Sequence, residues 1–238
     1  MFKFAAMSQR NIYAVLVAGG SGTRMGSETP KQFLPLDGIP ILQRTMMRFM
    51  EAVPGIRFVT VLPASHIDEW KRLCALNSFN CPQTMVAGGI TRFHSVKNAL
   101  ERIPDGAIVM IHDGVRPFVS TDLLGRILEE MQSQRAVIPV TPVTDTLKLL
   151  GSDSEGVLRE EGPAPQRSRL WGAQTPQTFL SEDIKEAYRQ AFEKSFTDDA
   201  SVASRKGIPL SFVQGERFNI KITTPEDLVF GEAILKCR

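Results

Sequence analysis

A glycine-rich loop near the start of the chain combines backbone flexibility with two cationic side chains. It follows an apolar run at 13–18, holds Arg24 and ends at Lys31. Its glycines are Gly19, Gly20, Gly22 and Gly26. Glycine lets backbone N–H groups approach an anion closely, and the two cations add charge that backbone dipoles cannot supply. The pattern predicts a site for a polyphosphate rather than for a neutral ligand.

Two familiar nucleotide-binding loops do not match this sequence. A Walker A loop ends in Gly-Lys-Ser or Gly-Lys-Thr, whereas Gly26 is followed by Ser27. The dinucleotide fingerprint has a third glycine where this chain has Met25, and Pro30 and Pro35 bar a continuous helix after the loop. These departures count against an NAD(P)-dependent oxidoreductase.

An aspartate and an arginine follow a second apolar run, at 108–112. Asp113 suits a Mg²⁺ ligand, because that ion is usually held by one or two carboxylates together with substrate phosphates. An ion pair between Asp113 and Arg116 across a turn explains the same spacing equally well. The sequence leaves both interpretations open.

Two other charged stretches each allow a structural interpretation as well as a functional one. They are Lys221 and the segment Thr197-Asp198-Asp199. Lys221 stands between two isoleucines, so it either points outward with strand period two or points inward as a third cation for phosphates. The segment reads most simply as a helix N-cap with acids in the first turn.

Nothing in the sequence supports covalent catalysis. The histidines are His66, His94 and His112, and no serine or cysteine in a nucleophile setting stands beside one. A phosphate monoester, whose second pKa is about 6, is already a competent nucleophile at neutral pH. Positioning and charge neutralisation are then the chemistry that these residues can supply.

The composition predicts a globular protein that binds a small anion at a local site. The 238 residues are 42% hydrophobic, enough for a full core without disulfides. A formal charge of +2 is too small for a nucleic-acid surface. The three cysteines form no Cys-x-x-Cys pair, and no apolar run has signal-peptide or membrane-span length. We therefore expect a cytoplasmic protein with neither a nucleic-acid nor a membrane partner.

Apolar runs and helical spacing alternate along the chain and predict a mostly parallel sheet flanked by helices. The expected strands are 13–18, 57–62, 85–87, 108–112, 136–140 and 210–213. The expected helices are 40–51, 65–76, 93–102, 121–134, 181–193, 198–206 and one from Pro225, with Thr121 and Thr224 as N-caps. This is an α/β, Rossmann-like fold in a single domain, 1–238. Ligands of open α/β sheets bind outside the carboxyl ends of the strands, where the glycine loop and Asp113 fall.

The segment at about 144–175 breaks this alternation. It is rich in glycine, serine, proline and charged residues, with only brief apolar runs around 147–150. The pattern predicts a projecting β-arm, and an arm of this length packs against something, often a second subunit, or stays mobile. We expect it to mediate a homodimer with composite sites.

With these residues assembled, the chain resembles the 2-C-methyl-D-erythritol 4-phosphate cytidylyltransferase family from about Tyr13 to the last helix. The matching blocks are Ala18-Gly-Gly-Ser-Gly-Thr-Arg-Met-Gly26 with Pro30-Lys-Gln-Phe33, Gly88-Gly-Ile-Thr-Arg-Phe-His-Ser-Val96, His112-Asp-Gly-Val-Arg-Pro117, Pro142-Val-Thr-Asp-Thr-Leu-Lys148, Gln174-Thr-Pro-Gln177, Thr197-Asp-Asp-Ala200 and Asn219-Ile-Lys-Ile-Thr-Thr-Pro-Glu-Asp227. The resemblance implies Mg²⁺-assisted transfer of CMP from CTP to a sugar-alcohol phosphate with release of pyrophosphate, in the methylerythritol phosphate route to isoprenoids.

The resemblance also implies roles for the matching residues. Arg24 and Lys31 would stabilise the triphosphate, Asp113 would help to bind metal and substrate, and Lys221 would contact phosphate, and these make up the implied catalytic set. The implied nucleotide-binding residues are Ala18, Gly19, Gly20, Gly22, Arg24, Lys31, Gly88, Gly89 and Ser95, the last three in the cytosine region. The implied acceptor-binding residues are Asp113, Arg116, Thr197 and Lys221, together with Thr146 and Arg167, which the arm would deliver to a partner subunit.

Two positions depart from the family pattern. Gly114-Val115 replaces the more common Ala-Ala pair, a form also associated with ribitol 5-phosphate cytidylyltransferases, and Ile90 stands where polar residues are frequent. The block that ends at Lys148 and the compact segment before Ile108 fit the methylerythritol enzymes better. A ribitol 5-phosphate enzyme stays an alternative, as does a catalytically silent nucleotide-binding subunit, which the presence of Asp113 disfavours.

Overall fold

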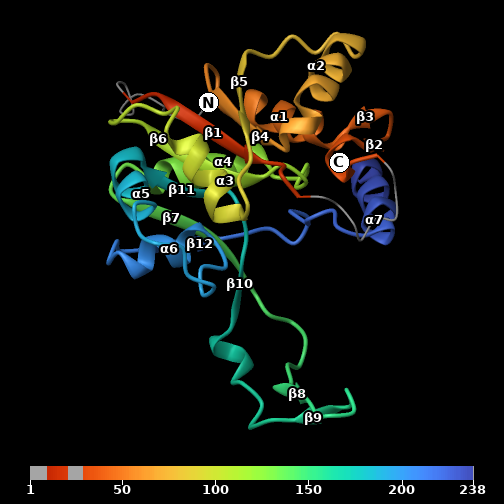
Figure 1. Ribbon diagram of the computed structural model, residues 1–238, viewed down its shortest axis with the longest axis vertical. Coiled ribbons are helices and arrows are strands. Elements are labelled where there is room, and N and C mark those ends of the chain that lie inside the picture. Colours follow the sequence, from red (N-terminus) through yellow and green to blue (C-terminus); the bar gives the residue numbers. More distant parts are fainter. Residues whose placement is uncertain (1–9, 21–28, 238) are drawn as a thin grey trace.

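The computed structural model describes residues 10–20 and 29–237. Within these ranges an eight-stranded mixed sheet runs in the order β10-β7-β11-β6-β1-β4-β5, with β12 paired to β7. The strands are β1 (Ile12–Val17), β4 (Arg57–Leu62), β5 (Gln83–Ala87), β6 (Ile108–Asp113), β7 (Ala136–Pro142), β10 (Trp171–Ala173), β11 (Gln177–Leu180) and β12 (Ser211–Gln214). The expected α/β fold with a mostly parallel sheet is confirmed (Figure 1).

Four parallel strands bring the chemistry-bearing loops to one edge of the sheet. β1 pairs in parallel with both β4 and β6, and β4 pairs in parallel with β5. The register sets Val17 opposite Asp113 on one side and opposite Val61 on the other. The glycine segment that follows Val17 therefore leaves the sheet beside Asp113.

Alternating side chains of β1 face two separate hydrophobic layers. Tyr13 and Val15 pack in one cluster with residues of α3 (Arg92–Leu100), α5 (Ser181–Ala187) and α6 (Asp199–Arg205). Ala14 and Leu16 pack in another with residues of α1 (Ile41–Ala52), α2 (Ile67–Leu76) and α4 (Thr121–Glu130). Period-two alternation in a strand covered on both faces produces this arrangement.

Helix starts follow local capping chemistry, with one correction. Ser120, not Thr121, is the N-cap of α4, and its Oγ accepts a hydrogen bond from the Leu123 N–H at 2.9 Å. Thr224 is the N-cap of α7 (Pro225–Lys236) as expected, and its N–H donates to Asp227 Oδ2 at 2.9 Å. Helix α1 begins at Ile41, because Pro40 closes the short hairpin of β2 (Pro35–Leu36) and β3 (Ile39–Pro40).

Two helices end four or more residues before the ends that their sequence patterns predict. α4 ends at Glu130 instead of 134, and α5 ends at Ala187 instead of 193. At the end of α5, Gln190 Nε2 donates to the carbonyl oxygens of Ala187 at 2.9 Å and Val202 at 3.1 Å. This side chain satisfies the last carbonyl of α5 and joins that helix to α6, so tertiary contacts outweigh the helical spacing beyond Ala187.

A long excursion between β7 and β10 forms the expected arm. Figure 1 shows it extending away from the sheet, with the hairpin of β8 (Leu150–Ser152) and β9 (Leu158–Glu160) at its far end and the turn η4 (Arg167–Arg169) on its return. The projecting part ends earlier than expected, because β10 already pairs with β7 from Trp171 to Ala173. None of the helices in the described ranges has the length and apolar character that a membrane span needs.

Candidate active site

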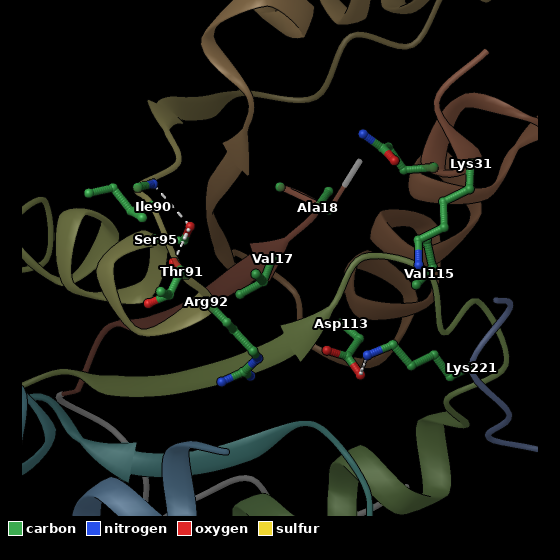
Figure 2. A pocket seen from close by; sticks show the side chains of 14 residues that line it. Val17, Ala18, Lys31, Ile90, Thr91, Arg92, Ser95, Asp113, Val115 and Lys221 are labelled. Atoms are coloured by element: carbon green, nitrogen blue, oxygen red, sulfur yellow. Dashed lines mark hydrogen bonds and ion pairs between the residues drawn. The ribbon is translucent and has the colours of Figure 1, made fainter. Parts of the chain in front are cut away.

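A cavity of about 470 Å³ opens at the carboxyl ends of β1, β5 and β6 (Figure 2). The residues that line it are Val17, Ala18, Gly19, Gly20, Lys31, Gln32, Gly89, Ile90, Thr91, Arg92, Ser95, Asp113, Val115 and Lys221. Hydrogen bonds continue the sheet just past its strands, from Ala18 N–H to the Val61 carbonyl and from Gly114 N–H to the Val17 carbonyl, both 2.9 Å. This pairing holds the two loops rigidly at the cavity floor.

Most of the sequence-predicted site residues that the structure describes meet in this cavity. Lys31 lies in the turn η2 (Lys31–Phe33). Lys221 comes from a segment far along the chain and lines the same cavity (Figure 2). Gly88 and Arg116 are described but are not among the lining residues. Gly22 and Arg24 lie outside the described residues.

Asp113 is a buried carboxylate held ionised by three cations. Its Oδ2 accepts hydrogen bonds from Arg116 Nε at 3.0 Å and contacts Lys221 Nζ at 3.1 Å. Burial alone would raise the pKa of Asp113, but Lys221, Arg116 and Arg92 outweigh it and hold that pKa well below its usual range. Asp113 therefore forms the ion pair with Arg116 and also lines the cavity.

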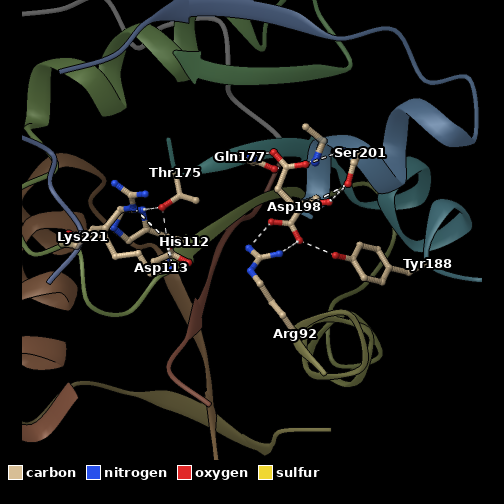
Figure 3. Close-up of polar contacts among 12 residues, drawn as sticks. Arg92, His112, Asp113, Thr175, Gln177, Tyr188, Asp198, Ser201 and Lys221 are labelled. Carbon is tan, nitrogen blue, oxygen red and sulfur yellow. Dashed lines mark hydrogen bonds and ion pairs between the residues drawn. The ribbon is translucent and has the colours of Figure 1, made fainter. Parts of the chain in front are cut away.

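His112 is a neutral strut beneath this cluster rather than a proton carrier. Its Nε2 lies 3.1 Å from the Arg116 carbonyl, which can only accept, so Nε2 carries the proton. Its Nδ1, 2.9 Å from Thr175 Oγ1, then accepts from the threonine hydroxyl, and the same oxygen accepts from Asp113 N–H at 3.2 Å (Figure 3). Burial lowers the pKa of His112 to about 4, in agreement with this bonding.

The turn between β5 and α3 is tightly packed around Ser95. The Ser95 hydroxyl accepts from Gly89 N–H at 3.0 Å and donates to the Thr91 carbonyl at 2.9 Å. A Cβ on Gly89 would lie 2.4 Å from that of His94, so only glycine fits there without a backbone shift. Ile90 also lines the cavity and is 96% exposed. Its apolar side chain offers no hydrogen bond to a ligand there.

The structure adds a charged pair between the partly exposed Arg92 and the fully buried Asp199, which the sequence interpretation missed. Arg92 donates through Nη1 and Nη2 to the two carboxylate oxygens of Asp199 at 2.7 and 2.6 Å, and the Tyr188 hydroxyl donates to Asp199 at 2.5 Å (Figure 3). Burial opposes the charge of Arg92, but Asp199 outweighs it and holds the pKa of Arg92 above its usual value.

Asp198 is the residue of the segment Thr197-Asp198-Asp199 that caps the helix, as the sequence pattern predicted for that segment. It is the N-cap of α6, accepts from Ser201 N–H at 2.8 Å and also accepts from Gln177 Nε2 at 2.7 Å. Asp199 follows it in the first turn of the helix, where its carboxylate is bound by Arg92. Thr197 is exposed and is not among the lining residues of the cavity.

The two arm residues expected to bind the acceptor do not reach this cavity in the single chain. Thr146 and Arg167 are both exposed, and Arg167 Nη1 donates to the Thr144 carbonyl at 3.1 Å within the arm. A role for them at a phosphate site requires a second copy of the chain.

The sheet, the glycine segment and the convergent cations are typical of nucleotide-binding α/β proteins, a class whose ligands bind at the carboxyl edge of the strands. Residues 12–237 match the model of the family described as IspD, 2-C-methyl-D-erythritol 4-phosphate cytidylyltransferase. The chain belongs to this family, and the resemblance drawn from its motifs is confirmed.

Relatives and solved structures agree with this assignment. Proteins with the family name from Bacteroides thetaiotaomicron and Porphyromonas gingivalis are 45% identical over 222 residues and 44% identical over 224. The matches cover 93% and 94% of this chain and 98% and 97% of those proteins. The structure of 4-diphosphocytidyl-2C-methyl-D-erythritol synthase from Anaerococcus prevotii matches with a TM-score of 0.76 at 28% identity, over 95% of this chain and 99% of that one. The Thermus thermophilus 2-C-methyl-D-erythritol 4-phosphate cytidylyltransferase matches with a TM-score of 0.72 at 30% identity, over 96% and 100%.

The neutral state of His112 predicts a specific loss of stability in mild acid. Because its pKa is about 4 in the folded protein and about 6.5 when unfolded, the unfolded chain binds an extra proton between these values. Its contribution is therefore complete above pH 6.5 and falls by about 2 kcal/mol between pH 7 and pH 5. Urea unfolding across this range should show that slope in the wild type and lose it in His112→Gln, whereas His66→Gln, at a partly exposed histidine, should keep it. Equal slopes in the wild type and His112→Gln would contradict the neutral strut.

The Arg92–Asp199 pair predicts an ordered series of unfolding free energies. Tyr188→Phe removes one hydrogen bond to a charged group and should cost about 1–2 kcal/mol. Asp199→Asn leaves Arg92 without its anion and should cost about 3 kcal/mol. Asp68→Asn breaks an exposed pair with Lys71 and should leave urea unfolding unchanged. A loss in Asp199→Asn no larger than in Asp68→Asn would show that the Arg92–Asp199 pair contributes nothing to folding.

Proposed function

We propose that this chain transfers CMP from CTP to 2-C-methyl-D-erythritol 4-phosphate and releases pyrophosphate. The observation that carries the proposal is the convergence of Lys31, Lys221 and Arg92 with a glycine segment and the ionised Asp113 in one cavity. Such a site neutralises phosphate charge. The lining hydroxyl that lies beside a histidine, Thr91 Oγ1 at 2.9 Å from His94 Nδ1, is the N-cap of α3 and accepts the His94 N–H, so we assign it to the helix start and not to covalent catalysis. Membership of the family supports the same activity and favours the methylerythritol acceptor over ribitol 5-phosphate.

The reaction that fits is an in-line attack at the α-phosphorus of CTP. An oxygen of the acceptor's phosphate forms the new bond to phosphorus, the bond to the bridging oxygen of the β-phosphate breaks, and pyrophosphate leaves with that electron pair. The acceptor oxygen is already anionic, so no general base is needed, and His112 cannot serve as one because both its nitrogens are engaged. The enzyme then acts by position and charge.

Each candidate residue has a place in this proposal. Arg24, Lys31 and Lys221 stabilise the developing negative charge, and Asp113 aims Lys221 and Arg116. Nucleotide binding falls to Ala18, Gly19, Gly20, Gly22, Gly88, Gly89 and Ser95, besides Arg24 and Lys31. Acceptor binding falls to Asp113, Arg116, Thr197 and Lys221, with Thr146 and Arg167 from a partner's arm. The cytoplasmic location stays a prediction from the sequence.

A divalent cation fits this site only in company with the nucleotide. Among residues 10–20 and 29–237, no group of three or more His, Cys, Asp or Glu side chains is arranged to hold a metal ion. Asp113 offers one carboxylate, and two cations already contact its Oδ2. Mg²⁺ commonly takes one protein carboxylate and several phosphate oxygens, so we propose that Asp113 contacts an ion whose other ligands come from CTP and water. When bound, the ion would neutralise triphosphate charge.

Pyrophosphate release gives the direct test of activity. With CTP, Mg²⁺ and saturating acceptor, the wild type should turn over 2-C-methyl-D-erythritol 4-phosphate with a higher kcat/KM than ribitol 5-phosphate. Lys31→Ala should lower turnover by about 10²–10³ at saturating CTP, because one well-aimed charge at the transition state is lost.

The matched control is Lys71→Ala, which removes an exposed lysine of α2 outside the cavity and should turn over like the wild type. Wild-type turnover in Lys31→Ala would remove that lysine from the catalytic set. CTP binding without pyrophosphate release from any acceptor would favour a silent nucleotide-binding subunit.

The arm supports a homodimer because it exposes apolar side chains that nothing in the single chain covers within the described residues. Leu149, Leu150, Val157 and Leu158 of the arm are 48%, 45%, 45% and 65% exposed, and Trp171 at its base is 52% exposed. Exposed apolar groups gathered on one projecting segment mark an interaction surface. A second copy of the chain would cover them, and Thr146 and Arg167 of each arm would then lie toward the cavity of the other subunit.

Charge placed on the arm should dissociate the dimer. The double variant Leu150→Asp/Leu158→Asp should sediment and scatter light as a monomer and lose most of its turnover, since carboxylates oppose burial of the arm. Leu76→Asp is the control, because Leu76 is 73% exposed on α2, away from the arm, and should stay dimeric and active. A wild-type protein that is monomeric at full activity would exclude Thr146 and Arg167 from the site.

A further inference from the structure

Gln32 is a buried amide at the cavity wall that has no hydrogen-bond partner among residues 10–20 and 29–237. Its side chain is 1% exposed, and it is one of the residues that line the cavity. Neither Oε1 nor Nε2 has a hydrogen-bond partner within the described part of the chain. A carboxamide can accept two hydrogen bonds and donate two, so the whole polar end of this side chain is unused.

An amide in this state lowers the stability of the free protein. Each buried donor or acceptor without a partner lowers the free energy of unfolding by about 1–3 kcal/mol. Folded proteins rarely leave both polar atoms of one buried amide without a hydrogen bond. A buried polar group without a partner at a ligand cavity is explained most directly by a partner that arrives with the ligand.

The backbone at Gln32 is held firmly while its amide is not. Phe33, the next residue, is 3% exposed and stacks on Trp70 with ring centroids 5.6 Å apart. The Phe33 N–H donates to the Pro30 carbonyl at 2.8 Å. These contacts fix the turn η2, so the Gln32 backbone cannot move far. Its amide, by contrast, has no hydrogen bond in the described residues that a ligand would have to break.

We propose that Gln32 is a nucleotide-binding residue whose Nε2 donates to an oxygen of the β- or γ-phosphate of CTP. This inference rests on the proposed CTP site. The phosphate end is favoured because Gln32 directly follows Lys31 and shares the cavity with Gly19 and Gly20, the segment whose backbone and cation suit a polyphosphate. A neutral donor there adds a hydrogen bond to phosphate without adding charge beside Asp113.

Methionine tests this role because it keeps the length and bulk of glutamine and removes both polar atoms. In calorimetric titration, Gln32→Met should bind CTP about 10-fold or more weakly, the loss of one hydrogen bond to a charged group. CMP, which lacks the β- and γ-phosphates, should bind both proteins alike. The thermal midpoint of the free variant should equal or exceed that of the wild type, since two unpaired buried atoms are gone. A group that merely supported the fold would lower that midpoint and leave CTP affinity unchanged.

Gln43 offers a matched control within the same chain. It is a glutamine of α1, 7% exposed, whose Oε1 also has no partner in the described residues, but it does not line the cavity. Gln43→Met should bind CTP like the wild type. Gln32→Leu provides a second variant if methionine perturbs folding, because it also removes both polar atoms, and it should weaken CTP binding as methionine does.

The outcomes separate this inference from the proposed function. Failure of the wild type to bind CTP would overturn the proposed function itself. Wild-type binding together with unchanged affinity in Gln32→Met would overturn the role of Gln32 alone. Equal weakening of CMP and CTP would overturn the phosphate assignment.

Discussion

The ionised carboxylate of Asp113 is the constraint on which the site depends. A carboxylate that is 7% exposed is stable as an anion only with cations close by, and those cations come from three parts of the chain. Arg116 ties the turn after β6 to the segment before α7 through the Asn219 carbonyl at 2.8 Å. Lys221 comes from that segment, and Arg92 from the start of α3. Compensating one buried charge thus fixes how three loops stand around the cavity.

The parallel register explains why those loops are adjacent at all. Val17 pairs with Asp113, so the glycine segment and the carboxylate leave neighbouring strands at the same level. His112, one residue earlier, faces the opposite side of β6, where its two hydrogen bonds to Thr175 and to the Arg116 carbonyl support the turn. Strand period two thus gives adjacent residues different tasks, Asp113 in the cavity and His112 beneath it.

The fold and the centre of the site could be predicted from short-range pattern. Runs of β-branched and apolar residues marked the strands, and carboxyl-end placement brought Lys31 and Asp113 together. Lys221 lines the cavity, whereas its neighbours Ile220 and Ile222 pack into an apolar cluster, so the alternation of these residues places its ammonium where a phosphate contact stays a prediction. The Arg92–Asp199–Tyr188 network could not be predicted, because its ion pair joins residues 107 apart and local sequence explains Asp199 as a first-turn acid. The early end of α5 was missed for the same reason, since Gln190 reaches across to Val202.

Asp113 lines the cavity in which we propose that the triphosphate binds, and its negative charge opposes that ligand unless the surrounding cations still have N–H donors free for phosphate. They do: an ammonium has three N–H donors, and Asp113 engages Lys221 through a single oxygen, Oδ2. The carboxylate therefore restrains Lys221 without exhausting it, and the rotational freedom that a long lysine side chain would lose on meeting phosphate is lost in folding instead. Arg92 is restrained in the same manner by Asp199, at a cost in desolvation that the bidentate geometry offsets. In both pairs an anion holds a cation in place without any ligand, which is the arrangement that the proposed CTP site requires.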